Sequence, residues 1–342
     1  MSAQTLESIA KAMVAPGRGI LAADESTGTI EKSLQSINVE NTEENRRAYR
    51  DLLFSAKGIG QYISGVILYD ETLRQKSADG TPFPALLARQ GVIPGIKVDT
   101  GAKEMALCPG ETVTEGLDGL AKRCAEYVKL GAKFAKWRAV ITIGAGIPSP
   151  ACITANAHAL ARYAAICQAA GLVPIVEPEV LMDGDHAIDR CEEVTEWTLR
   201  EQFAALASQR VAFERMVLKP SMVVAGASCR QQAPVAEVAE RTLKILRRTV
   251  PGAVPGIAFL SGGQSDTLAT AHLDAMNKLG AAPWTLSFSY GRALQAAALK
   301  AWKGSAANVS SAQAAFIHRA RMNGLAATGR YSADLERHAL AA

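Results

Sequence analysis

The chain has 342 residues and a mass of 36.1 kDa, with 49% hydrophobic and 20% charged residues. This balance is typical of a globular protein with a large buried core and excludes a disordered chain. The net charge of +4 is mild and no block of lysine and arginine accompanies it. We therefore do not expect nucleic acid as a main partner, whereas an anionic small substrate would suit the charge.

The amino-terminal segment, MSAQTLESIAKAMVAPG, places Glu7 and Lys11 where a signal peptide needs an unbroken apolar stretch. No later segment approaches the roughly 18 consecutive apolar residues of a membrane span. The six cysteines lie far apart without a CxxC pair, which favours free thiols over a disulfide framework or a zinc site. We expect a soluble, cytoplasmic protein with no membrane partner.

Short apolar runs, each closed by a polar residue or a glycine, predict eight strands buried on both faces. They cover residues 19–24, 65–70, 93–99, 134–140, 174–179, 216–220, 256–263 and 284–291. Helical patterns occupy most of the intervals, for example residues 42–56 and 236–250, and NTEE at 41–44 is typical of a helix N-terminus. Strands that alternate with helices predict a mostly parallel sheet.

No Gly/Ser linker or change in composition divides the chain. We therefore expect residues 1–342 to form a single domain, with a flexible tail over about residues 328–342.

Polar side chains stand at or near the downstream end of six predicted strands: Asp24, Lys97, Lys136, Glu177, Lys219 and Ser261. In an open sheet with strands ~4.8 Å apart, the first and eighth strands would be roughly 34 Å apart, and these groups could not act together. Burying the charges separately would cost several kcal/mol each, against a net stability of about 5–15 kcal/mol. Closure gathers every strand end around one mouth.

The sequence therefore predicts an α/β fold with a closed (β/α)8 TIM barrel. A short helical segment precedes the barrel, and a C-terminal helix and tail follow it. Residues two apart on a strand face the same way, so Lys136 shares a face with Arg138, and Glu177 shares a face with Glu179. We expect these two cations and two carboxylates to point into one cavity.

Lys219 stands in an apolar, β-branched run, MVLKPSMVVAG, and Pro220 follows it at once. Proline gives no N–H to a ladder, so we expect Lys219 at about the last position of its strand, at the rim of the barrel interior. An amine in a dry pocket near a second cation, here Lys136, loses its proton more readily and becomes a nucleophile toward ketones and aldehydes.

These features predict a Schiff base on Lys219, with Glu177 and Asp24 available for proton transfer. Two plainer interpretations stay open. Lys219 could be a surface lysine at a strand end, and Lys136 could form an interior salt bridge to a glutamate.

Two glycine-containing stretches, FLSGGQS and SYGRAL, predict phosphate binding. Gly262, Gly263 and Gly291 allow backbone N–H groups to approach an anion, and each stretch leads into a predicted helix N-terminus. Arg292 can grip phosphate with two hydrogen bonds. Loops after the seventh and eighth barrel strands often hold phosphate, although glycine pairs are also common in ordinary loops.

The five histidines show no HxH or HxxxH spacing. We therefore expect no metal site, and no cofactor is needed for the chemistry above.

Long motifs occur in order along the chain: LAADESTGT, ENTEENRRAYR, GIKVD, FAKWR, CQAAGLVPIVEPEVLMDGDH, LKPSMV, FLSGGQS and SFSYGRALQ. With this set the sequence closely resembles the metal-independent, Schiff-base (class I) fructose-bisphosphate aldolases, from about residue 4 to 331. The resemblance implies an (α/β)8 barrel, usually a homotetramer. It also implies reversible cleavage of fructose 1,6-bisphosphate into dihydroxyacetone phosphate and glyceraldehyde 3-phosphate.

The resemblance further implies roles for the matching residues. Lys219 would be the Schiff-base lysine, Glu177 the acid and base for carbinolamine formation and dehydration, and Asp24 the acceptor of the C4 hydroxyl proton. Lys136 would keep the site electropositive. The implied substrate and phosphate contacts are Lys97, Arg138 and Glu179 around the cavity and the second phosphate, Ser261, Gly262, Gly291 and Arg292 at the first phosphate, and Ser26 with Thr29 on the other side.

Two departures from the family pattern affect these expectations. The family often has an arginine four residues after the last serine of its STGS segment, whereas this chain has Thr29 and then Ser33. The preference between monophosphate and bisphosphate sugars therefore stays open. Animal members end in a tyrosine that assists proton exchange of the enamine, and this chain ends RYSADLERHALAA. We expect Glu177, directly or through water, to do that work here.

Other functions are compatible with parts of the pattern. A transaldolase, a deoxyribose-phosphate aldolase, or an aldolase that prefers fructose 1-phosphate or sedoheptulose 1,7-bisphosphate would use the same lysine. A binding scaffold is a different class of function, since aldolases of this type associate with actin. A scaffold would need none of the catalytic residues, yet all the principal ones are present.

Overall fold

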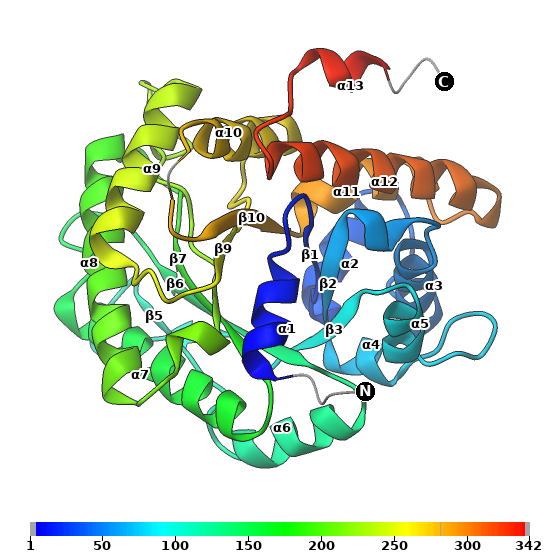
Figure 1. Ribbon diagram of the computed structural model, residues 1–342, viewed down its shortest axis with the longest axis horizontal. Helices are drawn as coiled ribbons and strands as arrows, with labels where there is room; N and C mark the ends of the chain where they lie inside the picture. Colours follow the sequence, from blue (N-terminus) through cyan, green and yellow to red (C-terminus); the bar gives the residue numbers. More distant parts are fainter. Residues whose placement is uncertain (1–4, 281, 339–342) are drawn as a thin grey trace.

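The computed structural model describes residues 5–280 and 282–338, and within them eight parallel strands form a closed barrel surrounded by helices (Figure 1). The barrel strands are β1 (Gly19–Ala23), β2 (Ile63–Leu68), β3 (Ile93–Lys97), β6 (Phe134–Ile141), β7 (Val173–Val180), β8 (Val217–Leu218), β9 (Gly256–Phe259) and β10 (Thr285–Tyr290). Each strand pairs with the next one along the chain, and β10 pairs with β1. The predicted TIM barrel and its strand positions are confirmed.

Helices fill the intervals between strands and extend the fold beyond them. The first and last are α1 (Leu6–Met13) and α13 (Asp334–His338). Between them lie α2 (Thr27–Gln35), α3 (Glu43–Phe54), α4 (Asp70–Arg74), α5 (Phe83–Arg89), α6 (Leu120–Lys129), α7 (Pro150–Ala169), α8 (Ile188–Ser208), α9 (Val235–Thr249), α10 (Asp266–Lys278), α11 (Arg292–Trp302) and α12 (Val309–Ala326). Short 3-10 turns occupy Ile59–Gln61, Phe213–Arg215 and Ala306–Asn308, and β4 (Ala102–Glu104) pairs antiparallel with β5 (Thr112–Thr114).

The N-terminus of α3 shows how local chemistry places a helix. Thr42 lies in extended backbone and its hydroxyl accepts the N–H of Asn45 at 3.1 Å. Glu43 and Glu44 occupy the first turn, where negative charge compensates the helix dipole. The N-terminus predicted at NTEE is therefore confirmed.

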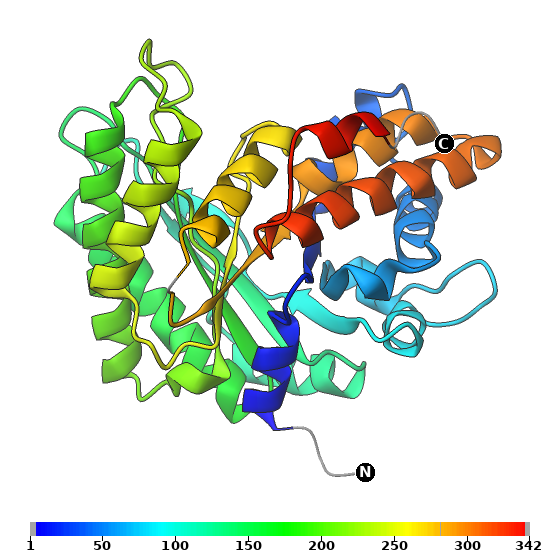
Figure 2. The same cartoon turned by 45° about the horizontal axis from the view of Figure 1, so that its top comes forward.

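The half of the barrel interior near the start of the strands is apolar. Ile20, Ile67, Ile175, Val217 and Ala258 pack there in one buried cluster, together with side chains of α1. Helix α1 thereby closes the end of the barrel at which the strands begin, and Figure 2 shows it at one end of the strands.

The Phe134 ring lies in this apolar half of the interior. It fits there because its neighbour on β3 is a glycine. A Cβ at Gly95 would lie 2.2 Å from the Phe134 ring. Two residues beyond Phe134, on the same face of β6, stands Lys136. The apolar layer therefore gives way to a charged layer toward the carboxyl ends of the strands.

The C-terminal part packs on the barrel exterior, with α12 beside α11 (Figure 1). Glu336 of α13 accepts hydrogen bonds from Arg319 of α12 and from the Tyr331 hydroxyl. The flexible tail expected over about residues 328–342 includes residues 339–342, which lie outside the described residues. Every helix within the described ranges is too short or too polar to cross a membrane.

Candidate active site

Lys219 lies immediately after β8, at the position expected for a strand end followed by proline. Its backbone N–H donates to the carbonyl of Val176 at 2.8 Å, and the Pro220 carbonyl accepts from Leu260 at 3.1 Å. The ladder therefore continues on both sides of the lysine and fixes its backbone. The residue is 3% exposed, so the surface-lysine interpretation is excluded.

Four charged side chains meet inside the mouth, two from strands β6 and β7 and two from the residues that directly follow β1 and β8. Lys219 Nζ lies 3.0 Å from Glu177 Oε1, and Lys136 Nζ lies 3.1 Å from Glu177 Oε2. Lys136 also donates a hydrogen bond to Asp24 Oδ2 at 3.0 Å. The order Asp24, Lys136, Glu177, Lys219 alternates in charge, so two buried cations are balanced by two buried carboxylates.

The electrostatics of this cluster fix its ionisation. Burial disfavours the charged forms of Asp24 and Glu177, but the cations outweigh it and lower both pKa values, with Lys136 contributing most and Lys219 next. For Lys136, burial again disfavours the charge, while Asp24 and Glu177 outweigh it and raise the pKa above its ordinary value. Asp24 and Glu177 are therefore carboxylates and Lys136 is an ammonium at neutral pH.

The interior salt bridge considered for Lys136 is thus present, and it involves two carboxylates instead of one. The same contacts keep Lys136 charged beside Lys219. Lys136 therefore provides the fixed positive charge that was expected beside Lys219.

A second pair of charges lies nearer the opening. Arg138 forms an ion pair with Glu179, and the Arg138 side chain is 43% exposed. Lys97 is level with Lys136 in the β3–β6 register, and its Nζ lies 3.7 Å from Asp99 Oδ1. The structure therefore brings the predicted cavity residues together, each beside a group of opposite charge.

Asp99 is a residue of this site that the sequence analysis missed. Its side chain is 3% exposed, and Oδ2 accepts the backbone N–H of Arg138 at 3.2 Å. It therefore links the ends of β3 and β6 as well as facing Lys97. The available signal was its place two residues after Lys97, where alternation puts both side chains on one face.

The loops after β9 and β10 meet at the place predicted for the first phosphate. Gly262 and Gly263 follow Ser261 with φ of +59° and +97°, conformations that favour glycine. A Cβ at Gly263 would lie 3.3 Å from Arg292 Nη2, so this guanidinium adjoins the loop. Within the described residues no side chain caps α11 after Gly291, which leaves its first N–H groups available to an anion.

The Ser26 side lies at the other predicted phosphate contact. Ser26 precedes α2, and its hydroxyl lies 3.0 Å from the Thr29 hydroxyl instead of capping the described start of the helix. The neutral hydroxyls of Ser26 and Thr29 therefore come shortly after Asp24 in the chain. The role of Ser26 and Thr29 in phosphate binding stays a prediction.

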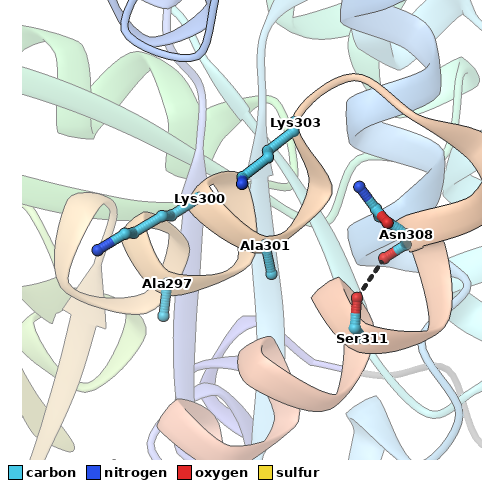
Figure 3. A pocket seen from close by; sticks show the side chains of 6 residues that line it. All are labelled: Ala297, Lys300, Ala301, Lys303, Asn308 and Ser311. Carbon is cyan, nitrogen blue, oxygen red and sulfur yellow. Dashed lines mark hydrogen bonds between the residues drawn. The ribbon is translucent and has the colours of Figure 1, made fainter.

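Two surface hollows lie away from this cluster. The larger, about 470 Å³, is formed by α11 and the start of α12 and is lined by Ala297, Lys300, Ala301, Lys303, Asn308 and Ser311 (Figure 3). The other, about 280 Å³, lies near the start of β10 around Trp284 and Asn277. Neither includes a residue of the charged cluster, so we assign neither to the chemistry.

The described residues also bear on metal binding. Among residues 5–280 and 282–338, no three histidine, cysteine, aspartate or glutamate side chains are grouped so that they could hold a metal ion. Asp24 and Glu177 are each in contact with an ammonium group.

Comparisons with known proteins agree with the fold and with the motifs. The model of the family described as fructose-bisphosphate aldolase class-I matches residues 5–342. A probable fructose-bisphosphate aldolase class 1 from Xanthomonas campestris pv. campestris is 60% identical over 97% of this chain and 99% of its own length. The cytoplasmic isozyme of fructose-bisphosphate aldolase from Spinacia oleracea is 57% identical over 92% of this chain and 88% of its own length.

A solved structure extends the likeness to three dimensions. The fructose-bisphosphate aldolase of Plasmodium falciparum, crystallised with TRAP and a small-molecule inhibitor, is 50% identical and superposes with a TM-score of 0.95 over 96% of this chain and 95% of its own. Because both the family match and the high identities extend over nearly the whole length, the chain belongs to the class I fructose-bisphosphate aldolase family.

Proposed function

We propose that Lys219 is the Schiff-base nucleophile of this enzyme and that Glu177, Lys136 and Asp24 complete its catalytic group. The enzyme is a class I fructose-bisphosphate aldolase, and it cleaves fructose 1,6-bisphosphate reversibly to dihydroxyacetone phosphate and glyceraldehyde 3-phosphate through a lysine Schiff base. The observation that carries the residue assignment is the alternating, buried chain of charges that ends at Lys219.

Glu177 is suited to the first stage because its Oε1 lies 3.0 Å from Lys219 Nζ. Lys219 first gives one ammonium proton to Glu177 and then adds to the C2 carbonyl as a neutral amine. A second proton leaves nitrogen after the addition, and the C2 oxygen receives these two protons. Loss of that oxygen as water then gives the protonated imine. Glu177 can accept the first proton and return one to the leaving hydroxyl, which is the reach that general acid–base catalysis requires.

Asp24 is suited to the cleavage stage because Lys136 holds it as a carboxylate. Asp24 takes the proton of the C4 hydroxyl as the C3–C4 bond breaks, and the bonding electrons move into the imine to form an enamine. The C4 carbon leaves as an aldehyde. Proton return to C3, which we assign to Glu177 directly or through water, and hydrolysis of the imine then free the ketone and Lys219.

The two phosphates would meet different surroundings. The first would contact Ser261, Gly262, Gly291 and Arg292, where helix N–H groups and a guanidinium converge. The second would meet Ser26, Thr29, Lys97 and Arg138, where the hydroxyls are neutral and each cation faces a carboxylate. This weaker cationic grip favours fructose 1-phosphate as the second candidate substrate.

We further propose a cytoplasmic homotetramer made of one domain per chain. The spinach relative is named as a cytoplasmic isozyme and an Arabidopsis thaliana relative as cytosolic, which supports the compartment. The tetramer follows from the family resemblance, and light scattering on the purified protein tests it.

Borohydride reduction tests the nucleophile. Dihydroxyacetone phosphate and borohydride should inactivate the enzyme, and peptide mass mapping should place the reduced adduct on Lys219. An adduct on Lys136 or Lys97 would contradict the assignment. Comparing cleavage rates on fructose 1,6-bisphosphate and fructose 1-phosphate decides between the two candidate substrates.

A further inference from the structure

The turn after β1 carries Asp24, Glu25 and Ser26 in succession, and Glu25 contacts two helices from distant parts of the chain. Glu25 Oε2 accepts from Arg50 Nη2 of α3 at 2.7 Å. Glu25 Oε1 accepts from Gln295 Nε2 of α11 at 2.8 Å. Each carboxylate oxygen is therefore held by a different helix.

The contact with Arg50 ties the turn to α3. Arg50 is 2% exposed, and a guanidinium cannot shed its charge, so a buried one requires an anion. Within the described residues Glu25 is the acidic side chain in salt-bridge contact with Arg50, and the Nε and Nη1 atoms of Arg50 have no hydrogen-bond partner there. Displacement of Glu25 would leave a buried positive charge unbalanced, so this contact resists movement of the turn.

The contact with Gln295 ties the same turn to α11. The Gln295 side-chain nitrogen also donates to the Ala22 carbonyl at 2.8 Å, so one amide bonds to the chain on both sides of Asp24. Gln295 stands one helical turn after Arg292 and is 5% exposed. It therefore joins the segment that carries Asp24 to the helix whose first turn lies at the first-phosphate contacts.

We propose that Glu25 and Gln295 are positioning residues for carbon–carbon cleavage. They fix Asp24 relative to the N-terminus of α11, so that a sugar held by its first phosphate presents its C4 hydroxyl to that carboxylate. The inference rests on the proposed function, in which Asp24 takes the C4 proton. The inference explains what sets the distance between Asp24 and the first phosphate. Lys136 does not set this distance, because Lys136 contacts Asp24 only at the side chain.

Two reactions of the same enzyme separate this role from a general structural one. Schiff-base formation with dihydroxyacetone phosphate uses Lys219 and the first-phosphate site but not Asp24. Cleavage of fructose 1,6-bisphosphate uses all three. The experiment therefore measures borohydride trapping over a range of dihydroxyacetone phosphate concentrations, and single-turnover cleavage, in Glu25→Gln, Gln295→Met and Asp24→Asn.

A small misplacement of a catalytic group costs up to ~100-fold in rate, so we expect cleavage to fall about 10- to 100-fold in the Glu25 and Gln295 variants. The dihydroxyacetone phosphate concentration that half-saturates trapping, and the extent of trapping, should stay within about twofold of the wild-type values. Asp24→Asn should likewise lose cleavage and keep trapping. The double variant should lose less than the product of the single losses, because both changes release one turn.

Matched controls use the same chemical changes elsewhere. Glu44→Gln removes an exposed carboxylate of α3 that pairs with Arg47. Gln168→Met removes an amide that donates to the carbonyls of Ala212 and Arg215, outside the charged cluster. Both should leave the ratio of cleavage to trapping at the wild-type value. Since Glu25→Gln leaves the Arg50 charge unpaired and could prevent folding, Gln295→Met carries the test by itself if needed.

Normal cleavage in Gln295→Met, with cleavage lost in Asp24→Asn, would overturn this inference and leave the role of Asp24 intact. Parallel loss of trapping and cleavage would also contradict it, because that pattern indicates a generally disturbed site. Normal cleavage in Asp24→Asn would refute the proposed role of Asp24 and this inference together.

Discussion

The two halves of the barrel interior differ in chemistry although the same strands form both. Near the start of the strands, Phe134, Ile175 and Val217 pack on α1 and on one another. Two residues further along each strand, Lys136, Glu177 and Lys219 meet in a buried charge cluster. Burial of apolar groups stabilises the fold, whereas burial of charges offsets part of that stabilisation. The residues that stabilise the fold and the residues proposed to react are therefore separated by only two positions along each strand.

Removal of the nucleophile should have the largest effect. Lys219→Met should lower cleavage on the order of 10⁴-fold or more, because the proposed Schiff-base nucleophile is lost. The fold should persist, since Glu177 keeps Lys136 as a partner. Steady-state kinetics measures the loss of cleavage, and thermal unfolding measures whether the fold persists. Retained turnover would show that the charged half does not hold the nucleophile.

A cavity in the apolar half should lower stability and leave cleavage nearly unchanged. Phe134→Ala should lower the free energy of unfolding by about 3–5 kcal/mol, because a fully buried ring is lost. Denaturant titration measures this loss. The folded variant should keep kcat/KM near the wild-type value. A selective loss of kcat at full stability would show that the two halves are not separable.

Acid should weaken the charged half of the barrel interior. Asp24 and Glu177 have pKa values below their ordinary ones, so the unfolded chain takes up protons first as the pH falls. Their stabilisation is therefore present above the unfolded pKa values of about 4 and is lost as the pH drops through the lower folded values. Each group contributes about 1.4 kcal/mol per pH unit in that window. Unfolding titrations between about pH 2 and 5 should show a shallower slope for Asp24→Asn.

Chelators should have the smallest effect. The protonated imine is the electron sink in the proposed mechanism, so EDTA should leave cleavage unchanged after long incubation. An added divalent ion should not raise the rate either. Strong inhibition by a chelator, reversed by one metal, would place a Lewis acid in the charged half.

The barrel and most of the mouth could be predicted from the sequence because their signals are local. Each strand is a short apolar run, and the charged site residues stand within such a run or just after it. Other elements gave weaker signals. The buried face of helix α12 carries the polar side chains Arg319 and Asn323 beside Ala312 and Phe316, so it lacks a continuous apolar stripe. The β4–β5 hairpin is too short and too exposed at β4 to show alternation.

Pairings between distant residues could not be predicted from spacing. Lys136 contacts Asp24 across 112 positions, and Gln295 contacts Glu25 across 270. Motif reading selects residues with reactive groups, and an amide such as Gln295 has none. Its place beside Asp24 depends on how β1 and β10 close the barrel, which no local pattern encodes.

The one-step alternation on β6 and β7 has a consequence for how such an enzyme can change. A single inserted or deleted residue within β6 would turn Trp137 inward and Lys136 outward, because neighbouring side chains face opposite ways. After a deletion, the indole would replace the ammonium between the two carboxylates. New substrate preferences can therefore arise by exchanging side chains at the rim or by lengthening the loops, while the count of residues along these strands must be inherited unchanged.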